Sequence, residues 1–503
     1  MHLNLARYKF DNVIKWDVIG YYSYLPTTFI EKDVTLSFIT PENKIKYNGI
    51  KYGYVDDSKG NHIIKYSMGM SVLYAPFFFV AHVLASPLGF EADGYSAIYE
   101  FFIEFSGLFY LLIGFWFLRK LLLQFYDEKV TSITLGLVFF GTNLLYYSAV
   151  ESPMTHAYTL SLCSVLLYYT FDFYKKASFK NTMVLAFIFG LILLVRPLNI
   201  LLILPFLFFN VSSFNDVKLR LAFLIKHYKN ALLFIAITFL MLLPQLLYYK
   251  YVTGNYFAFS YGKEGFFFNQ FHLLDVLVSF RKGWFIYTPL MLLALYGITK
   301  MKANHPFKTS VLVLLPIYLY LVSSWWCWWY GGSFSQRSMI DIYPLLALPL
   351  AAFIFQISHF SVNKQKVIFT IIILFVLLNI FQTVQYKYNI IDFDGMTAKE
   401  YVQVFGTLDD KRIEIEVPKK AHIEILDSSM PFDMSSMQES LNKMLGGLNK
   451  ETIKKEVFIK DAKVLLRGIA SEGLLDSEAI KIEALKRCEN GGIIFLDEID
   501  KIA

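Results

Sequence analysis

The chain has 503 residues, of which 56% are hydrophobic, 18% aromatic and only 17% charged. This composition is too apolar for an ordinary soluble protein and predicts a membrane protein. The formal net charge of +6 is small for the length, and the basic residues form short clusters between apolar runs, so nucleic acid is not an expected partner. The 3 cysteines lack metal-ligand spacing, and their odd count argues against a disulfide framework.

Residues 1–97 form the first predicted region, an extracytoplasmic loop with interfacial helices. No cleavable signal peptide is expected, because charges and tyrosines occupy the place where its apolar core would lie. The apolar run 68–89 is broken by Pro76, His82 and Pro87. We expect this run to lie along the outer interface rather than to cross the membrane.

Residues 98–386 form the second predicted region, a transmembrane bundle, because apolar runs of about 20 residues are long enough to cross a hydrocarbon core. The run 182–212 is interrupted by Arg196-Pro197, which either kinks one long helix or forms the tip of two short ones. The basic connections should all be cytoplasmic, which requires 182–212 to cross twice. About ten spans follow, and the other members are 98–118, 130–149, 157–174, 231–251, 284–299, 309–326, 341–358 and 366–386.

The composition changes abruptly after the predicted junction at residues 387–405. Residues 406–503 are charged, and "LDDKRIEIEVPKKAHIEILDSS" alternates polar and apolar side chains. A later stretch has the pattern of an amphipathic helix, and "GIIFLDEID" that of a buried strand ending in acids. The expected fold is therefore an all-α polytopic membrane protein followed by a small soluble α/β segment.

Asp17, in "KWDVIGYYSYLP", is the candidate general base of the chain. Partial desolvation in a loop at the membrane surface can raise the proton affinity of a carboxylate and suit it to this role. A helix cap or a solvated loop acid is the alternative. The neighbouring Tyr21 and Tyr22 could shape a pocket or anchor the loop, and the sequence does not choose between these functions.

Several further side chains are candidate substrate contacts. Lys65 and Arg337, near the outer interface, could extend to lipid head groups or hold a lipid-linked phosphate, for which the arginine fork is better shaped. Arg196 lies inside an apolar run, where a charge usually faces a cavity or an anionic partner unless it extends to the interface. His156 could bond a helix start or bind a ligand, and Trp328 belongs to an interfacial belt or stacks on a sugar.

Several segments together resemble the bacterial GT-C glycosyltransferases, of the protein mannosyltransferase and aminoarabinose transferase type, over residues 1 to about 405. They are "WDVIGYYSYLP", "KYSMGMSVLYAPFFFVAH", "SPMTHAYTLSL", "LVRPLNILLILP", "GNYFAFSYG", "RKGWFIYTPLMLLAL" and "SSWWCWWYGGSFSQRSMIDIYPLLALPLA". The resemblance implies sugar transfer from a polyprenyl-phosphate donor to a glycan, lipid or protein acceptor. The reaction would take place on the extracytoplasmic face of the bacterial inner membrane.

The family's catalytic aspartate corresponds to Asp17, the only acid in the matching segment. Donor-phosphate contacts are expected from Lys65, Arg196 and Arg337, on the basis of their charge and predicted side. Some members of the family use a divalent metal beside paired acids, but no acidic pair adjoins Asp17, so no tightly bound metal is expected. No other tightly bound cofactor is expected either. The family begins with a membrane helix before this loop, whereas "MHLNLARYKFDNVIKWD" contains no such span, so the first helix is expected to be missing.

The tail resembles part of an HslU-type AAA+ unfoldase, the ATPase subunit of a bacterial proteasome-like protease. The resemblance covers much of the inserted domain and the Walker B strand in "GGIIFLDEIDKIA". It implies that Asp497 and Glu498 would hold magnesium and polarise the attacking water. No "GxxxxGK[ST]" stretch occurs, so the segment is expected not to work as an ATPase and a fusion of two gene pieces is the favoured hypothesis. The alternative functions are a flippase for lipid-linked sugars and an ATP-dependent protease subunit.

Overall fold

The computed structural model of the chain describes residues 13–47, 49–57, 59–262, 264–408, 412–418 and 452–458. The chain divides into two compact units. One comprises Met1–Lys387 and Phe393–Phe405, and the other comprises Tyr388–Asp392 and Gly406–Ala503.

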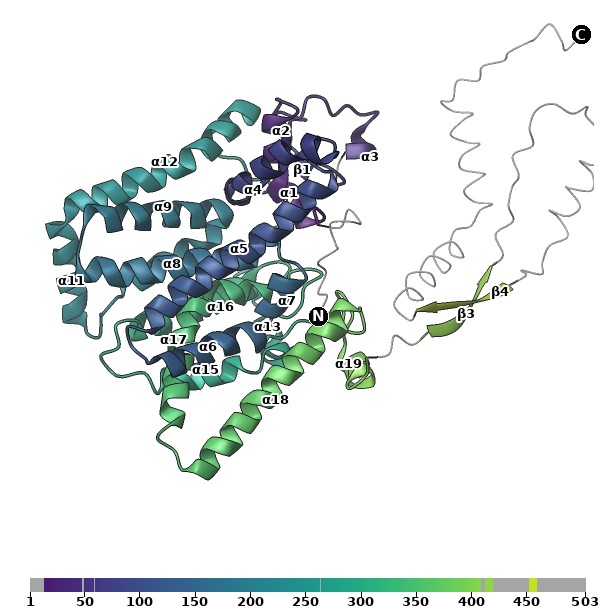
Figure 1. The fold of residues 1–503 in the computed structure, drawn as a ribbon. Coiled ribbons are helices and arrows are strands. Elements are labelled where there is room, and N and C mark those ends of the chain that lie inside the picture. The colour runs from purple at the N-terminus through teal and green to yellow at the C-terminus, as the bar shows by residue number, and fades with distance from the viewer. Residues whose placement is uncertain are drawn as a thin grey trace, which may run out of the picture. The chain divides into compact units, whose positions relative to one another are not determined.

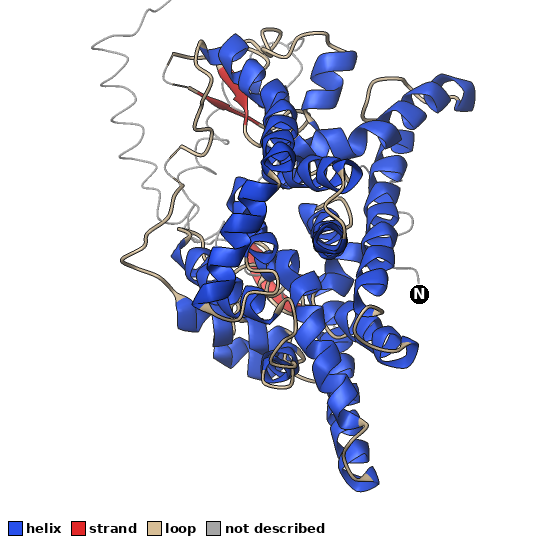
Figure 2. Ribbon diagram, turned by 90° about the vertical axis from the view of Figure 1, so that its left-hand side faces the viewer, coloured by secondary structure: helices blue, strands red, loops and turns tan. Residues whose placement is uncertain are grey.

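The described part of the first unit is mostly helical (Figures 1 and 2). Five described helices are long and apolar enough to cross a membrane by length and composition: Gly69–Leu88, Ala97–Leu122, Tyr228–Thr253, Arg337–Ile357 and Val362–Lys387. Shorter apolar helices are Phe179–Val195, Pro197–Leu207 and Lys308–Ser324. These helices are compatible with a membrane protein, whereas the number of spans stays a prediction.

The N-terminal part of this unit contains short helices and a small β-hairpin. The elements are α1 (Asp17–Tyr22), α2 (Tyr24–Phe29), α3 (Lys44–Tyr47), β1 (Tyr54–Asp56), β2 (His62–Ile64), α4 (Gly69–Ala85) and the 3-10 helix η2 (Ser86–Leu88). The antiparallel strands pair Tyr54 with Ile64 and Asp56 with His62. The run expected at the interface is helical in spite of the internal Pro76. By length and composition alone, α4 and η2 together are long and apolar enough to cross a membrane.

The next helices follow the predicted runs, with one break. They are α5 (Ala97–Leu122), α6 (Glu128–Phe140), α7 (Leu144–Ala149), α8 (Thr155–Lys175), α9 (Phe179–Val195), the 3-10 helix η3 (Pro197–Ile203), α10 (Leu204–Leu207), α11 (Phe214–Lys226) and α12 (Tyr228–Thr253). The predicted run 130–149 is divided into α6 and α7 after Phe140. Helix α8 packs between α5 and α9, and α9 packs against α12 (Figure 1). A Cβ atom on Gly114 of α5 would lie 2.7 Å from the Cα atom of Ser161, so glycine permits the close contact with α8.

The interruption at Arg196-Pro197 reverses the chain. Helix α9 ends at Val195, and Arg196 has extended backbone angles, as expected before a proline. The segment that follows returns toward the end of α8, where the Tyr174 hydroxyl donates a 2.9 Å hydrogen bond to the carbonyl of Phe206. The geometry is therefore that of two short segments meeting at a tip, and their crossing of a membrane stays a prediction.

The last helices of the unit are α13 (Leu273–Val278), α14 (Trp284–Tyr287), α15 (Met291–Ile298), α16 (Lys308–Ser324), η4 (Arg337–Ile342, 3-10), α17 (Tyr343–Ile357), α18 (Val362–Lys387) and α19 (Ala398–Val404). The predicted run 284–299 is two helices, because Pro289 interrupts the backbone hydrogen bonds between them. Helix α17 is almost completely buried and packs against α6, α8 and α15.

The second unit contributes two described strands, β3 (Arg412–Pro418) and β4 (Thr452–Phe458), which pair antiparallel. The alternation in "RIEIEV" is typical of a strand with two different faces. The predicted amphipathic helix and the strand "GIIFLDEID" lie outside the described residues.

Candidate functional site

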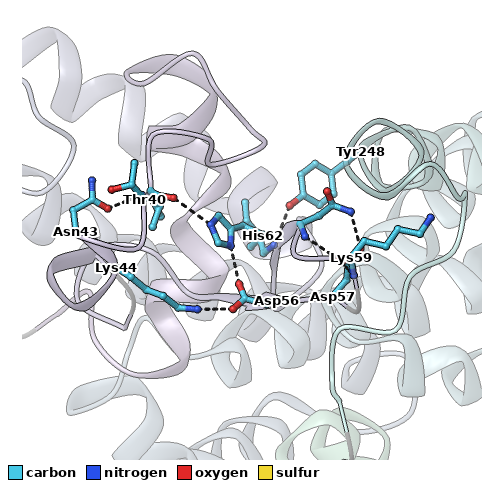
Figure 3. A network of polar contacts seen from close by, with 11 residues as sticks. Thr40, Asn43, Lys44, Asp56, Asp57, Lys59, His62 and Tyr248 are labelled. Carbon is cyan, nitrogen blue, oxygen red and sulfur yellow. Dashed lines mark hydrogen bonds and ion pairs between the residues drawn. The ribbon is translucent and has the colours of Figure 1, made fainter. Parts of the chain in front are cut away.

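A polar network fixes the β1–β2 hairpin in place (Figure 3). The imidazole of His62 contacts the carboxylate of Asp56 at 2.7 Å, and the same carboxylate forms an ion pair with Lys44. The backbone N–H of Ile64 donates a 2.9 Å hydrogen bond to the hydroxyl of Tyr248 on α12. Both ends of β2 are thereby attached, and the two residues that follow it have a defined position.

Asp17, the predicted base, lies in the first turn of α1 and contacts two other elements. The hydroxyl of Tyr66, just after β2, donates to its Oδ1 atom at 2.7 Å. The guanidinium of Arg337, at the start of η4, donates to its Oδ2 atom at 3.2 Å. The Tyr21 ring packs on Tyr66 with 4.5 Å between the centroids. Asp17, Tyr21, Arg337 and Tyr66 therefore form one cluster.

The side chain of Asp17 is 30% exposed, and that of its partner Arg337 is 15% exposed. Burial raises the pKa of Asp17, but the charge of Arg337 and the hydrogen bonds from Tyr66 and Arg337 outweigh burial and lower the pKa below its usual value. The sequence predicted desolvation and a raised proton affinity. The desolvation is present, whereas the net direction is reversed by Arg337.

The alternative of a helix cap does not describe Asp17. The residue before it, Trp16, occupies the N-cap position of α1 and makes no side-chain capping bond. The carboxylate of Asp17 is instead directed to Tyr66 and Arg337.

A second carboxylate, Asp341, was missed in the sequence. Its side chain is fully buried and belongs to η4. Four side chains donate hydrogen bonds to it: Thr159 at 2.6 Å, Arg196 at 3.0 Å, Asn199 at 2.9 Å and Tyr318 at 3.3 Å. The charge of Asp341 is therefore fully compensated inside the bundle.

The short helix η4 connects the two carboxylate clusters. Its first residue, Arg337, pairs with Asp17, and Asp341, one turn later, pairs with Arg196 at the tip between α9 and η3. The structure thus brings both predicted arginines to one region. The buried Nε atom of Arg337 makes no hydrogen bond, so this guanidinium retains a free donor.

His156, in the first turn of α8, adjoins the Asp341 cluster. Its side chain is fully buried, and its Nδ1 atom lies 4.0 Å from Oδ1 of Asp341. The imidazole packs on the ring of Tyr147 with 4.5 Å between the centroids. Neither ring nitrogen makes a hydrogen bond, so the predicted bond to a helix start is not formed.

Lys65 lies beside the Asp17 cluster and is already paired. Its ammonium group is 2.9 Å from the carboxylate of Glu264 and lies over the rings of Tyr66 and Tyr261. The ion pair lines a cavity of about 140 Å³ between the hairpin and residues 259–262. Its charge acts on Asp17, so Lys65 belongs to the electrostatic surroundings of the predicted base.

Tyr22 and Trp328 lie in other contacts. Tyr22 is fully buried, and its hydroxyl donates to the carbonyl of Gly94, so it anchors the first region. Trp328 is 8% exposed and stacks on His272 with 5.8 Å between the centroids. Their roles as substrate contacts stay predictions.

Asp497 and Glu498 lie outside the described residues. Among the residues that the structure describes, no group of three or more His, Cys, Asp or Glu side chains is placed to hold a metal ion.

No family model matches the chain. Similar curated proteins carry the name ATP-dependent protease ATPase subunit HslU. The protein of Helicobacter acinonychis (strain Sheeba) is 51% identical over 100 residues, which are 20% of this chain and 22% of that protein. The protein of Campylobacter jejuni subsp. jejuni (serotype O:23/36, strain 81-176) is 47% identical over 98 residues, which are 20% of this chain and 21% of that protein.

The chain therefore spans about a fifth of the length of these relatives. The matched length is close to that of the segment 406–503, in which the sequence resembles the same proteins. A segment of HslU type is thus supported, and the matches leave most of the chain uncovered.

Proposed function

We propose that the helical unit is a multi-pass glycosyltransferase of the bacterial inner membrane. It would move a sugar from a polyprenyl-phosphate donor to a glycan, lipid or protein acceptor on the extracytoplasmic face. The contact between Asp17 and Arg337 supports this proposal most strongly, because it places an accessible carboxylate beside a guanidinium with a free donor. A sugar transfer with an anionic leaving group needs both groups.

The proposed reaction is one displacement at the anomeric carbon. Asp17 accepts the proton of the acceptor hydroxyl while the acceptor oxygen forms its bond to that carbon. The bond between the anomeric carbon and the phosphate oxygen breaks, and its electron pair remains on the polyprenyl phosphate. Arg337 stabilises the developing charge, because a guanidinium binds phosphate oxygens through two parallel hydrogen bonds. The configuration at the anomeric carbon is inverted.

The other predicted residues have supporting roles in this proposal. Arg196 adds a positive charge whose orientation is fixed by Asp341. The unpartnered ring nitrogens of His156 are available to a polar group of the substrate. Lys65 contributes its charge from the cavity beside the hairpin, and Tyr21 forms the wall of the Asp17 cluster.

The test is transfer by the purified full chain in proteoliposomes, with a radiolabelled polyprenyl-phosphate sugar and an acceptor extract. Asp17→Asn should lower the rate by about 10²–10⁴-fold, which is the contribution expected from a general base. The matched control is Glu91→Gln, at an exposed acid of the same region, which should transfer at the wild-type rate. Full activity of Asp17→Asn would contradict the base role. Movement of intact labelled lipid without transfer would favour the flippase.

An HslU-type ATPase function of the tail is the second candidate, favoured by the identity of 51% over 100 residues. In this proposal Asp497 and Glu498 would act as the Walker B acids. The chain contains no "GxxxxGK[ST]" stretch to surround the phosphates, so we expect it not to bind ATP. Titration with a fluorescent ATP analogue tests this expectation. Saturable, magnesium-dependent binding that is weakened in Asp497→Asn would favour the ATPase.

A further inference from the structure

The guanidinium of Arg337 cannot pair fully with Asp17 and with the leaving phosphate at the same time. It is bonded to Asp17 at 3.2 Å in the structure, where its charge stabilises the ionised carboxylate and makes it a weak base. The same guanidinium is the group that the leaving phosphate requires. Both side chains of the pair are partly accessible, at 15% exposure for Arg337 and 30% for Asp17, so an anion from solution can reach the pair.

The second ion pair of η4 has the opposite character. Asp341 is fully buried and accepts hydrogen bonds from four side chains, of which Arg196 is one. An anion that binds Arg196 would take one donor away from the buried carboxylate of Asp341. Leaving a buried charge with fewer hydrogen-bond donors is costly. Asp17 has one other bonded side chain, Tyr66, and an accessible surface. Exchange of the anion is therefore easier at Arg337 than at Arg196.

The unpartnered atoms around the pair point to an anionic ligand. The Nε–H group of Arg337 is buried without a hydrogen bond. The one N–H donor of a neutral imidazole at the fully buried His156, which adjoins the Asp341 cluster, is also without a partner. Buried donors are normally satisfied, so a group that is absent from the resting arrangement should complete them. A phosphate has enough acceptor oxygens to do so.

We propose that the Asp17–Arg337 ion pair is broken by exchange: the phosphate of the lipid-linked donor takes Arg337, and the freed Asp17 carboxylate, still bonded to Tyr66, becomes the base for the acceptor. This inference rests on the proposed function. It fixes the order of binding, because the base is released only when the donor is bound.

The exchange also raises the proton affinity of Asp17, which a general base requires. The groups that act most on Asp17 are Arg337 from η4, and Tyr66 and Lys65 from the segment after β2. The hydroxyls of Tyr21 and Tyr261 also interact with its charge. Lys65 is itself paired with Glu264, so Arg337 supplies the main unshared positive charge. When the phosphate neutralises Arg337 while burial persists, the pKa of Asp17 rises and the carboxylate becomes a stronger base.

The exchange predicts that removal of the base tightens binding of the phosphate. Farnesyl phosphate is titrated into the purified full chain in detergent and its affinity is measured by calorimetry. Asp17→Asn and Asp17→Ser should each bind it about tenfold more tightly than the wild type, because the competing carboxylate is gone. Arg337→Gln should bind it about tenfold more weakly. Binding of farnesol, which lacks the phosphate, should be the same in all variants.

Glu91→Gln is the matched control, because it also removes one negative charge of the first region, at an exposed acid that makes no contact with the Asp17–Arg337 pair. Its affinity for farnesyl phosphate should equal that of the wild type. Unchanged or weaker binding by both Asp17 variants, while the wild type binds, would overturn the exchange and leave the transferase proposal standing. A wild type that does not bind farnesyl phosphate, and Asp17 variants that do not either, would overturn both.

Discussion

Asp17 and Asp341 are both carboxylates paired with an arginine, but they differ in exposure and in the number of their hydrogen-bond partners. Asp17 is partly exposed, has two bonded side chains and lies at the start of a short helix. Asp341 is fully buried and has four donors from distant parts of the chain. Each is paired with an arginine, and η4 provides one member of each pair.

The difference teaches which of two paired carboxylates can be reactive. A buried charge with all its acceptor positions filled is costly to disturb and suits a structural role. A partly exposed carboxylate with few partners loses little when one partner leaves. The proposal therefore assigns chemistry to Asp17 and positioning of Arg196 to Asp341. The predictions below test this division.

The largest expected effect is the loss of stability when the Asp341 charge is removed. Asp341→Asn leaves Arg196, whose side chain is 20% exposed, without its counter-charge and with one donor too many at a fully buried position, and breaking a pair of this kind costs about 3–5 kcal/mol. Asp17→Asn, the same change in the accessible pair, should cost about 1 kcal/mol or less. The measurement is the unfolding midpoint of each variant in mixed detergent micelles. Equal destabilisation by both substitutions would show that the two pairs do not differ as proposed.

The next effect concerns pH. Because the pKa of Asp17 is lowered in the folded protein, its carboxylate is ionised above that lowered value, and the acidic limb of kcat/KM should lie below the usual range of aspartate. In Arg337→Gln burial still raises the pKa while the main opposing charge is lost, so the limb should move to higher pH by about one unit or more.

The measurement for this pH effect is the profile of kcat/KM for sugar transfer between about pH 3 and 8. Arg119→Gln is the control, because Arg119 of α5 forms an exposed ion pair with Glu128 of α6. This substitution should not change the pH of the acidic limb. If the acidic limb of kcat/KM lies at the same pH in Arg337→Gln as in the wild type, the limb reports the ionisation of a group other than Asp17.

Part of the site could be predicted from the sequence because charges are rare in apolar segments. Asp17 and Arg196 were selected for this reason, and Arg337 for its charge near the predicted outer interface. The structure brings the three side chains to one region. Asp341 carried the same signal, an acid within the apolar "SMIDIYPLL", and was missed. Tyr66 could not be predicted as a partner of Asp17, since the contact depends on how the β1–β2 hairpin folds back on α1.

For the helices, the sequence predicted the long elements but not the breaks between short ones. The apolar runs predicted α5, α12, α16, α17 and α18, because a long apolar run specifies where a helix lies. It does not show a local break in the backbone, so α6 and α7, and also α14 and α15, were each predicted as one span. In the tail, by contrast, the family resemblance was easier to recognise than the elements of structure. There the similarity to HslU was recognisable from residues, whereas only β3 and β4 are described.

The smallest effect in this comparison comes from Gly20, which follows Asp17 on α1. A Cβ atom at Gly20 would lie 2.6 Å from Cδ2 of Tyr66, so Gly20→Ala pushes the tyrosine ring away from its place. The hydroxyl of Tyr66 then loses its 2.7 Å contact with Asp17, while the Asp341 cluster is untouched. We expect transfer to fall several-fold, about what the loss of one hydrogen bond costs.

Gly136→Ala is the matched control for Gly20→Ala, because a Cβ atom at Gly136 of α6 would meet no atom within 4 Å. It should leave transfer unchanged and stabilise α6 slightly, since alanine favours a helix more than glycine does. Transfer rates and unfolding midpoints of both variants separate the two effects. If Gly20→Ala lowers the midpoint as much as Asp341→Asn does, the Asp17 cluster supports the fold as well, and the division between a reactive and a structural carboxylate would have to be abandoned.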